Sequence, residues 1–355
     1  MLAFHRIMYN SMNKYFSIIP KHFGSWCEAW KRICNFNELG FTSDKVDILL
    51  QAKKQTDPIR NFEYLEKKSI KALTINDPDY PKSLREIHNC PCVIYNIGNK
   101  ELLHKEAVAI IGSRSATPYG LKQAAKLAEQ LSGCGLTVVS GLARGIDAEA
   151  HSGALKAAGK TVAVMGSGID IPYPRENHKL YKEICEYGLV ISEYPPQIPP
   201  LRHHFPSRNR MISGLSLGVL IIEAAARSGT LITCDYALDQ GKEVFALPGP
   251  VTSSNSIGTL RLIQSGAKLV IDVHDILNEL PLNIDSLILQ EDKQAISDDY
   301  DKSKETLLKY FSWEPVHIDK LLCVSNRGKI DQEVLLDMEI KGLIKQLPGK
   351  YYVRV

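Results

Sequence analysis

The residues best suited to chemistry gather between Pro199 and Thr233, where a basic and aromatic cluster precedes an apolar run. Within nine positions the cluster holds Arg202, His203, His204, Phe205, Arg208, Asn209 and Arg210. An apolar strand is expected directly after it, over 217–222, followed by the turn Ser228-Gly229-Thr230, which opens a helix. Cationic side chains around one aromatic ring, beside a helix N-terminus, suit a ligand that carries phosphates and a ring. The competing interpretation is a solvated basic loop with Phe205 in the core.

Glycine and polar residues also collect directly after other expected strands. These turns are Gly112-Ser113-Arg114, the stretch from Ser140-Gly141 to Arg144, and Gly166-Ser167-Gly168. Glycine lets a backbone approach a phosphate closely, and the free N–H groups of a helix start bind anions. Helix N-caps need the same residue types, so a single turn of this kind is weak evidence. Several turns at one sheet edge predict a shared anion-binding crevice, with Ser228, Gly229 and Thr230 at one side.

The turns are expected to be held by strands and helices that alternate along the chain. Strands are expected over 107–111, 136–139, 161–165, 188–191, 217–222 and 243–247, and helices over 120–131, 147–158, 176–185, 230–240 and 259–264. Continuous apolar strands that alternate with helices indicate a parallel sheet covered on both faces. Residues 71–281 are therefore expected to form an α/β core around this parallel sheet, in which 71–104 supply edge strands and connectors. Ligands of such sheets bind beyond the carboxyl ends of the strands.

Smaller parts are expected on either side of this core. Residues 1–70 read as a small helical N-terminal domain without a glycine-hinged DNA-binding hairpin. Residues 282–302 are acidic and weakly patterned, which indicates a linker. Residues 303–355 are expected to form a winged helix, with helices at 304–311, 317–323 and 330–341 and a hairpin over 342–355. The third helix carries Asp331, Glu333, Asp337 and Glu339. This acidic surface favours a protein-contact role over DNA binding.

Composition excludes several classes of protein. Hydrophobic residues make up 44% and charged residues 23% of the 355, which is typical of a soluble globular protein. No apolar run approaches the roughly 20 residues of a membrane span and no signal peptide is visible, so a cytoplasmic location is expected. The eight cysteines lack zinc-ligand spacing, and we expect reduced thiols and no metal. Neither a G-x-G-x-x-G fingerprint nor a P-loop occurs, so no cofactor is expected. With a net charge of +3, any polyanion site must be a local cluster.

The strand-end motifs, in their order, resemble those of the DprA (Smf) family of DNA-processing proteins. The matching segments are AIIGSRSATPYG, VVSGLARGIDAEAH, VMGSGIDIPYPRENHKL, LVISEYPP, HHFPSRNRMISGLS, VLIIEAAARSGTLIT and VFALPG. They span about residues 72–272, and the conserved order of so many short motifs makes the resemblance specific.

The resemblance implies a fold and a function. Such proteins have an extended Rossmann-like core, often with a helical (SAM-like) N-terminal domain and a C-terminal winged helix. They bind single-stranded DNA, protect it during natural transformation, and help to load the RecA recombinase. They act as homodimers through the core, and no catalytic turnover is attributed to them.

The resemblance also implies roles for individual residues. Arg114 would hold a DNA phosphate, together with the backbone around Ser140-Gly141 and Gly229 and the cluster of Arg202, His203 and His204. Phe205 would stack a base. Arg208, Asn209 and Arg210 would shape the pocket, and the two arginines would add charge. Asp147, Asp170 and Glu223 are interpreted as structural, capping the turns or bonding the crevice's own arginines.

Two departures from the family pattern affect this assignment. Histidine at 203 and 204 stands where lysine or arginine would be permanently charged, so DNA binding is expected to strengthen as the pH falls toward ~6.5. Leu260 replaces an asparagine that is common in the family, which puts a polar contact of that turn in doubt.

Two other functions remain open from the sequence. A nucleotide-processing, phosphoribohydrolase-like Rossmann enzyme would also use a Gly-Thr turn, here Gly229-Thr230, with an acidic residue such as Glu223 nearby. A transcription regulator would instead give the winged helix the main role, and the acidic third helix counts against it.

Overall fold

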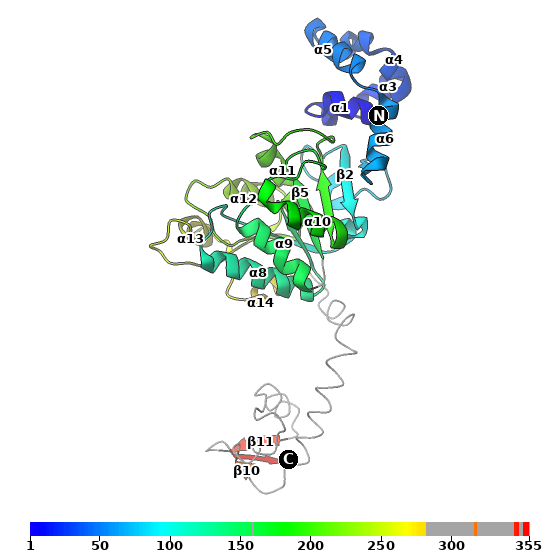
Figure 1. Ribbon diagram of the computed structural model, residues 1–355. Coiled ribbons are helices and arrows are strands. Elements are labelled where there is room, and N and C mark those ends of the chain that lie inside the picture. The colour runs from blue at the N-terminus through cyan, green and yellow to red at the C-terminus, as the bar shows by residue number, and fades with distance from the viewer. Residues whose placement is uncertain (158–159, 282–315, 318–343, 348–350, 355) are drawn as a thin grey trace. The chain divides into compact units, whose positions relative to one another are not determined.

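A computed structural model describes residues 1–157, 160–281, 316–317, 344–347 and 351–354 (Figure 1). The chain divides into two units, Met1–Leu282 and Asn283–Val355. Within the described residues, no helix has the length and apolar character needed to cross a membrane.

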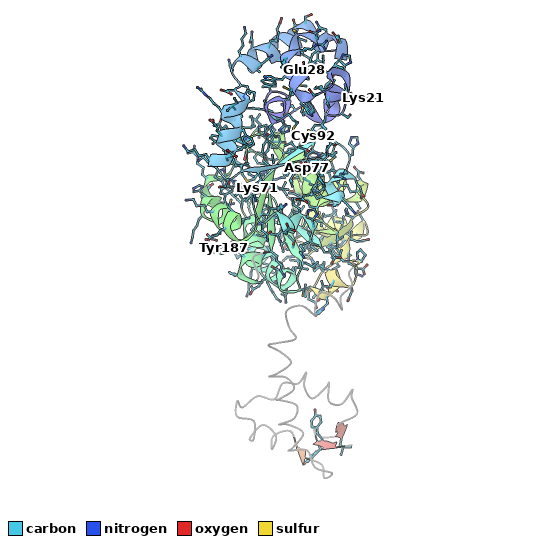
Figure 2. All side chains as sticks on the ribbon, turned by 90° about the vertical axis from the view of Figure 1, so that its right-hand side faces the viewer. Lys21, Glu28, Lys71, Asp77, Cys92 and Tyr187 are labelled. Carbon is cyan, nitrogen blue, oxygen red and sulfur yellow. The ribbon has the colours of Figure 1, made fainter. Side chains whose placement is uncertain are left out.

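The first unit is built on a sheet of nine strands in the order β1-β2-β6-β5-β4-β3-β7-β8-β9. The strands are β1 (Lys71–Thr74), β2 (Val93–Gly98), β3 (Ala107–Ile111), β4 (Thr137–Ser140), β5 (Thr161–Met165), β6 (Leu189–Ser192), β7 (Gly218–Ile221), β8 (Glu243–Ala246) and β9 (Lys268–Leu269). Only β2 runs opposite to its neighbours in this sheet, pairing antiparallel with both β1 and β6. Figure 2 labels Lys71 at the start of β1 and Cys92 just before β2. The fold is therefore the expected mixed α/β, mostly parallel and Rossmann-like.

The central strands β3, β5 and β7 are buried on both faces of the sheet because they are continuously apolar. Side chains alternate along each strand, so Val162 and Val164 of β5 belong to one hydrophobic cluster and Ala163 and Met165 to the other. The covering helices are α8 (Pro118–Gly133), α9 (Ile146–Ala157), α10 (His178–Tyr187), α11 (His204–Gly214), α12 (Thr230–Asp239), α13 (Ile257–Gln264) and α14 (His274–Leu277). Of these, α8 contacts α9 and α9 contacts α10, whereas α11 contacts α12 (Figure 1).

Helix α11 corrects the expectation for the basic cluster. No helix was predicted over this segment, but His204 to Gly214 form one, and its buried residues include Arg208 and Arg210. Pro206 lies in its first turn, where the missing N–H costs no intrahelical hydrogen bond. The helical pattern is hidden in the sequence because charged side chains occupy positions on the buried face, where apolar ones are usual.

Most of the first 70 residues lie in short helices. They form α1 (Leu2–Met8), α2 (Met12–Tyr15), α3 (Ile18–Phe23), α4 (Trp26–Lys31), η1 (Ile33–Leu39), α5 (Ser43–Lys54) and α6 (Pro58–Lys67). Their core is aromatic: the Phe4 ring lies 5.0 Å from Trp30 edge-on and 5.8 Å from Phe36 in a stacked arrangement. A hydrogen bond of 3.1 Å joins His5 Nδ1 to Tyr95 Oη of β2, so these helices belong to the same compact unit as the sheet. Two short 3-10 helices, η2 (Lys100–His104) and η3 (Arg175–Asn177), lie further along the chain.

The second unit is described in its strands alone. A three-stranded antiparallel sheet has the order β10-β12-β11, with β10 (Val316–His317), β11 (Ile344–Leu347) and β12 (Tyr351–Arg354). The pairing of β11 with β12 is the one that a hairpin over 342–355 requires. The helix expected to begin at His317 does not begin there, because His317 is a strand residue paired with Tyr351. The expected helices 304–311 and 330–341, and the linker 282–302, lie outside the described residues.

Candidate nucleic-acid interface

The predicted strand-end turns meet at one edge of the sheet. Strands β4, β5 and β6 follow one another on one side of β3. The next strand in the chain, β7, pairs with the other side of β3, so the strand order reverses there. In open α/β sheets, the carboxyl ends of the strands beside such a reversal are the usual ligand position. Gly112 follows β3, and its carbonyl oxygen accepts a hydrogen bond from Thr230 Oγ1 at 3.3 Å. The turn at 228–230 is thereby joined to the turn after β3.

The glycines of these turns are needed for packing between loops. A Cβ at Gly112 would lie 2.7 Å from the Ile146 side chain, and one at Gly141 would lie 2.7 Å from Arg208. Gly145 has a φ of +73° and would place a Cβ 2.4 Å from the carbonyl oxygen of Ser113. These glycines therefore bring the loops after β3 and β4 together, which differs from the direct phosphate approach expected of them. Gly229 alone of this group is exposed, with open space where a Cβ would be.

Three buried or half-buried carboxylates hold the loops in place, as structural residues do. Asp147 accepts hydrogen bonds from the backbone N–H groups of Gly141 (3.2 Å) and Ala143 (3.4 Å), and Glu223 accepts from that of Thr117 (2.9 Å) and from its hydroxyl. Asp170 accepts from Tyr64 Oη at 2.6 Å and from the Gln197 N–H at 2.8 Å. Burial raises the pKa of Asp147, and the nearby Arg208 guanidinium opposes that rise. Their partners are mainly backbone groups and hydroxyls, so the carboxylates organise the turns.

A small pocket brings together several of the predicted site residues. This Phe205 pocket has a volume of about 50 Å³ and is lined by Arg114, Gly141, Ala143, Arg144, Tyr173, Pro174 and Phe205. The Arg114 guanidinium carbon lies 5.4 Å from the centroid of the Phe205 ring, within the range of a cation–π contact. Arg114 and Arg144 are exposed, whereas Phe205 is half-buried and packs on Gly166. The arrangement offers accessible positive charge beside an aromatic ring.

Sequence reasoning did not assign Ala143, Tyr173 or Pro174 to the site, and Tyr173 is the aromatic residue among them. The Tyr173 ring centroid lies 5.5 Å from that of Phe205, although 32 positions separate the two residues in the chain. The signal that could have identified it is the aromatic residue inside Tyr173-Pro174-Arg175, a polar and proline-rich turn that follows β5.

Arg208 is buried next to the Phe205 pocket and bonds to the backbone of two strand ends. Its Nη1 donates to the carbonyl oxygen of Gly141 at 2.8 Å and to that of Val164, which ties the ends of β4 and β5 together. Its Nε donates to Asn209 Oδ1 at 3.2 Å, and its guanidinium carbon lies 5.9 Å from the Phe205 centroid. Burial lowers the pKa of Arg208 to about 10, so the side chain stays charged at neutral pH. Arg208 and Asn209 are not among the residues that line the pocket, and buried Arg208 offers it no accessible charge, contrary to expectation.

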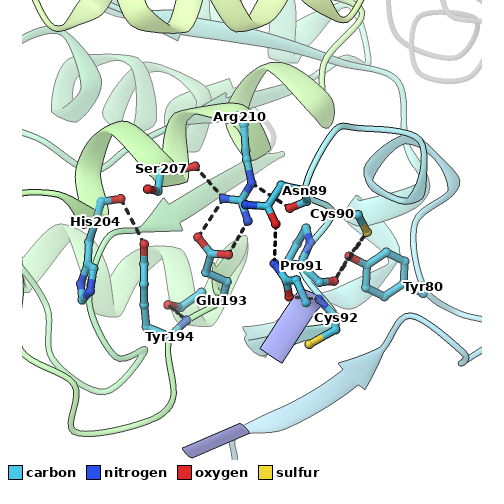
Figure 3. Close-up of polar contacts among 12 residues, drawn as sticks. Tyr80, Asn89, Cys90, Pro91, Cys92, Glu193, Tyr194, His204, Ser207 and Arg210 are labelled. Carbon is cyan, nitrogen blue, oxygen red and sulfur yellow. Dashed lines mark hydrogen bonds and ion pairs between the residues drawn. The ribbon is translucent and has the colours of Figure 1, made fainter. Parts of the chain in front are cut away.

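Arg210 does not contribute charge to the pocket, contrary to expectation. It is buried, and its Nη1 donates to Glu193 Oε1 at 2.8 Å while Nε donates to the Asn89 carbonyl oxygen at 3.0 Å (Figure 3). Arg210 Nη1 also donates to the Ser207 carbonyl oxygen, at 2.6 Å. The ion pair neutralises the guanidinium and fixes α11 to the segments before β2 and after β6. Arg210 therefore has a structural role.

Two further residues that were predicted for the site, Ser140 and His204, are buried. Ser140 is buried, and its hydroxyl donates to the Ile110 carbonyl oxygen at 2.6 Å. His204 is buried, and its ring stacks on that of Tyr194 with centroids 3.9 Å apart (Figure 3). Burial, together with neighbouring His203, lowers the pKa of His204, so it cannot supply the charge gain expected near pH 6.5. Arg202 and His203 are exposed, and Ser113 Oγ accepts from the Ser115 N–H at 3.2 Å.

No group of three histidine, cysteine, aspartate or glutamate side chains suited to a metal ion occurs among the residues that the structure describes.

Comparisons with known proteins agree on one relationship. A family model described as DNA recombination-mediator protein A matches residues 71–281. Protein Smf of Synechocystis is 34% identical over 95% of this chain and 94% of its own length. DNA processing protein DprA of Streptococcus pneumoniae is 46% identical over 59% of this chain and 73% of its own length.

Two solved structures share the fold of the core. The X-ray structure of DprA from Streptococcus pneumoniae superposes with a TM-score of 0.61 at 41% identity, covering 67% of this chain and 83% of that one. DNA processing protein A from Helicobacter pylori, whose structure was determined for its single-stranded DNA binding mode, superposes with a TM-score of 0.54 at 33% identity. That match covers 59% of this chain and 94% of the Helicobacter chain.

Proposed function

The chain belongs to the DNA recombination-mediator protein A family, and on that premise we propose that it binds single-stranded DNA at the Phe205 pocket, without catalytic turnover. One observation carries the proposal: exposed Arg114 lies over the Phe205 ring at the carboxyl edge of the sheet. A base can stack on an aromatic ring without sequence preference, while an adjacent arginine pairs with the phosphate. The described DNA-binding mode of the Helicobacter relative supports the same ligand class.

The proposed biological role follows from the family. The protein would take up single-stranded DNA that enters the cell during natural transformation, protect it, and help to load the RecA recombinase onto it. The description of the family as a recombination mediator supports this order of events. We further propose a cytoplasmic homodimer that associates through the Rossmann-like core, within which the winged-helix domain at 303–355 and the helical domain at 1–70 are accessory parts.

Glu223 weighs against the alternative of a phosphoribohydrolase-like enzyme. Its carboxylate accepts two hydrogen bonds from Thr117 at the start of α8, and Gly120 of that helix packs directly against it. An acid–base catalyst needs a carboxylate that can reach its substrate. Buried Glu223 is instead engaged in joining α8 to the loop after β7.

The proposal is tested by replacing Arg114 with alanine. We expect the affinity for fluorescein-labelled oligo-dT to fall roughly tenfold at low salt, because one phosphate contact is lost. The slope of log K against log salt should decrease by about one unit or slightly less. Fluorescence anisotropy over a salt series measures both quantities.

Arg60→Ala is the matched control, because this arginine has an 85% exposed side chain on α6 and does not line the Phe205 pocket. It should bind as the wild-type chain does. An Arg114→Ala variant with unchanged affinity and unchanged slope would contradict the proposed site.

A further inference from the structure

A second, larger cavity adjoins the Phe205 pocket, and Tyr173 lines both. This Tyr173 pocket has a volume of about 440 Å³ and is lined by Arg144, Ile171, Pro172, Tyr173, Pro174, Arg175, Glu176 and Pro200. The 50 Å³ of the Phe205 pocket is too small to enclose a nucleotide, since small-molecule sites have roughly 300–1,000 Å³. The Tyr173 pocket falls within the roughly 300–1,000 Å³ of small-molecule sites. The space for a nucleotide therefore lies on the Tyr173 side.

The rings of Tyr173 and Phe205 are neighbours, and the space between them is too narrow for a base. Their centroids are 5.5 Å apart and their planes are inclined by 44°. A base inserted between them would need roughly 7 Å, because each stacked contact takes about 3.5 Å. Tyr173 is 42% exposed and is the more accessible of the two rings, since Phe205 is half-buried. Tyr173 can therefore accept a base of its own rather than share one with Phe205.

The loop that carries Tyr173 is held in place on both sides of the ring. Ser167 Oγ donates to the Ile171 carbonyl oxygen at 2.8 Å. Asn177 Nδ2 donates to the carbonyl oxygens of Leu142 (2.9 Å) and Ala143 (3.1 Å) in the loop after β4. A platform that is already ordered loses little conformational entropy when a ligand binds.

The lining of the Tyr173 pocket has the chemistry of a nucleotide site. Ile171 and the prolines supply an apolar surface for a base and a sugar. Exposed Arg175 and Arg144 supply positive charge, and Arg144 lines both pockets. Glu176 is the one carboxylate among the residues that line this cavity, and it is ion-paired with Arg144.

The geometry points to a second nucleotide subsite, in which Tyr173 stacks the base next to the one on Phe205 and Arg144 binds the phosphate between them. The ligand is the adjoining nucleotide of the same single strand, bound without preference for sequence because stacking and phosphate pairing read no base edge. The inference rests on the proposed function and extends it from one stacked base to two.

A double-mutant cycle on the full-length chain tests the subsite. We expect Tyr173→Ala to weaken binding of labelled oligo-dT about tenfold, and Tyr173→Phe to bind as the wild-type chain does. If each ring stacks its own base, the losses from Tyr173→Ala and Phe205→Ala multiply in the double variant. The salt slope should not change with Tyr173→Ala, because no charge is removed. Fluorescence anisotropy at several salt concentrations gives all of these values.

The outcomes separate a subsite from a supporting contact. If Tyr173 only supports Phe205, the double variant binds no more weakly than Phe205→Ala alone, and the subsite is disproved. Tyr187→Ala is the matched control, since this tyrosine is 62% exposed at the end of α10 and lines neither pocket (Figure 2). It should bind normally. A wild-type chain that bound no oligonucleotide would overturn the proposed function and the subsite together, whereas normal wild-type binding with an unaffected Tyr173→Ala would overturn the subsite alone.

Discussion

Arg208 and Arg144 both lie near the Phe205 pocket, but they differ in their exposure to solvent. Arg208 is buried, and backbone carbonyl oxygens of two strand ends accept its hydrogen bonds. Arg144 is exposed, and its guanidinium pairs with Glu176 across the mouth of the Tyr173 pocket. A buried guanidinium engaged with carbonyl groups cannot turn toward a ligand without leaving them unsatisfied. Arg144 can leave the Glu176 carboxylate and pair with a DNA phosphate instead. Arg144 is therefore the arginine of this pair that is free to bind a ligand.

Glu176→Gln should therefore increase the affinity for single-stranded DNA. A hydrogen bond from a backbone N–H, and secondly the Arg144 guanidinium, hold the pKa of Glu176 below its usual range, so the carboxylate is ionised at neutral pH and competes with phosphate. Removing that charge should tighten binding about two- to fivefold and steepen the salt slope, because surface ion pairs have modest strength. Anisotropy titration of oligo-dT measures the change.

Glu183→Gln is the control for this variant. Glu183 also pairs with a cation, Lys179 at 3.7 Å on α10, and it does not line the Tyr173 pocket. Its replacement should leave DNA affinity unchanged. Equal or weaker binding by Glu176→Gln would show that Arg144 takes no part in holding DNA.

At the scale of elements, α11 links the pocket to the rest of the core. Its first turn presents Phe205 to the pocket, and its buried face carries Arg210, which is ion-paired with Glu193 after β6. The same turn carries His204, stacked on Tyr194, and Tyr9 at the end of α1 lies edge-on to both rings with centroids 6.0 Å away. The position of the stacking ring thus depends on contacts from α1, β6 and α11 together.

Glu193→Gln should destabilise the fold substantially. It leaves the Arg210 guanidinium buried without a counter-charge, a change that costs about 3–5 kcal/mol of unfolding free energy in comparable buried pairs. Urea denaturation followed by circular dichroism measures this cost. A Glu193→Leu, Arg210→Met double variant should recover part of it, since apolar replacement of a buried pair is often neutral.

The exposed pair of Lys31 with Glu28, three residues apart on α4, provides the comparison. Glu28→Gln should leave the urea midpoint unchanged. A Glu193→Gln midpoint equally unchanged would mean that water already reaches Arg210.

At the scale of the whole molecule, the candidate site belongs to one unit. Every residue that lines the Phe205 and Tyr173 pockets lies within Met1–Leu282, and the family match ends at 281. Of the few residues that the structure describes in the second unit, Asn283–Val355, none lines either pocket. Binding of single-stranded DNA at this site should therefore not require the C-terminal unit.

A chain that ends at Leu282 should bind oligo-dT with the affinity and salt slope of the full-length protein. The reason is that all of the proposed phosphate and stacking contacts remain. Parallel anisotropy titrations of the two chains measure the difference. A loss of about tenfold or more would assign DNA contacts to the C-terminal unit and would favour the regulator interpretation.

Much of the sheet could be predicted from local sequence. The bounds expected for β3 and β5 are those observed, because a continuous apolar run between glycine-rich turns has few other conformations in a buried sheet. Arg114, Gly141, Arg144 and Phe205 were also expected at the site, and they line one pocket. Helix α11 was missed because its buried face holds arginines, and a local pattern does not show that Glu193 and backbone carbonyl groups satisfy them.

The sequence by itself determined the apolar strands, the polar turns that end them, and the side chains available at those turns. Only the tertiary structure decided which of these meet: that β7 lies beside β3, that Tyr173 contacts Phe205, and that Arg114 stays exposed while Arg210 is buried in an ion pair. The physical reason is the distance along the chain over which each interaction acts. Hydrophobic period and turn chemistry act over a few residues, whereas strand order and the pairing of buried charges depend on packing between segments far apart in the chain.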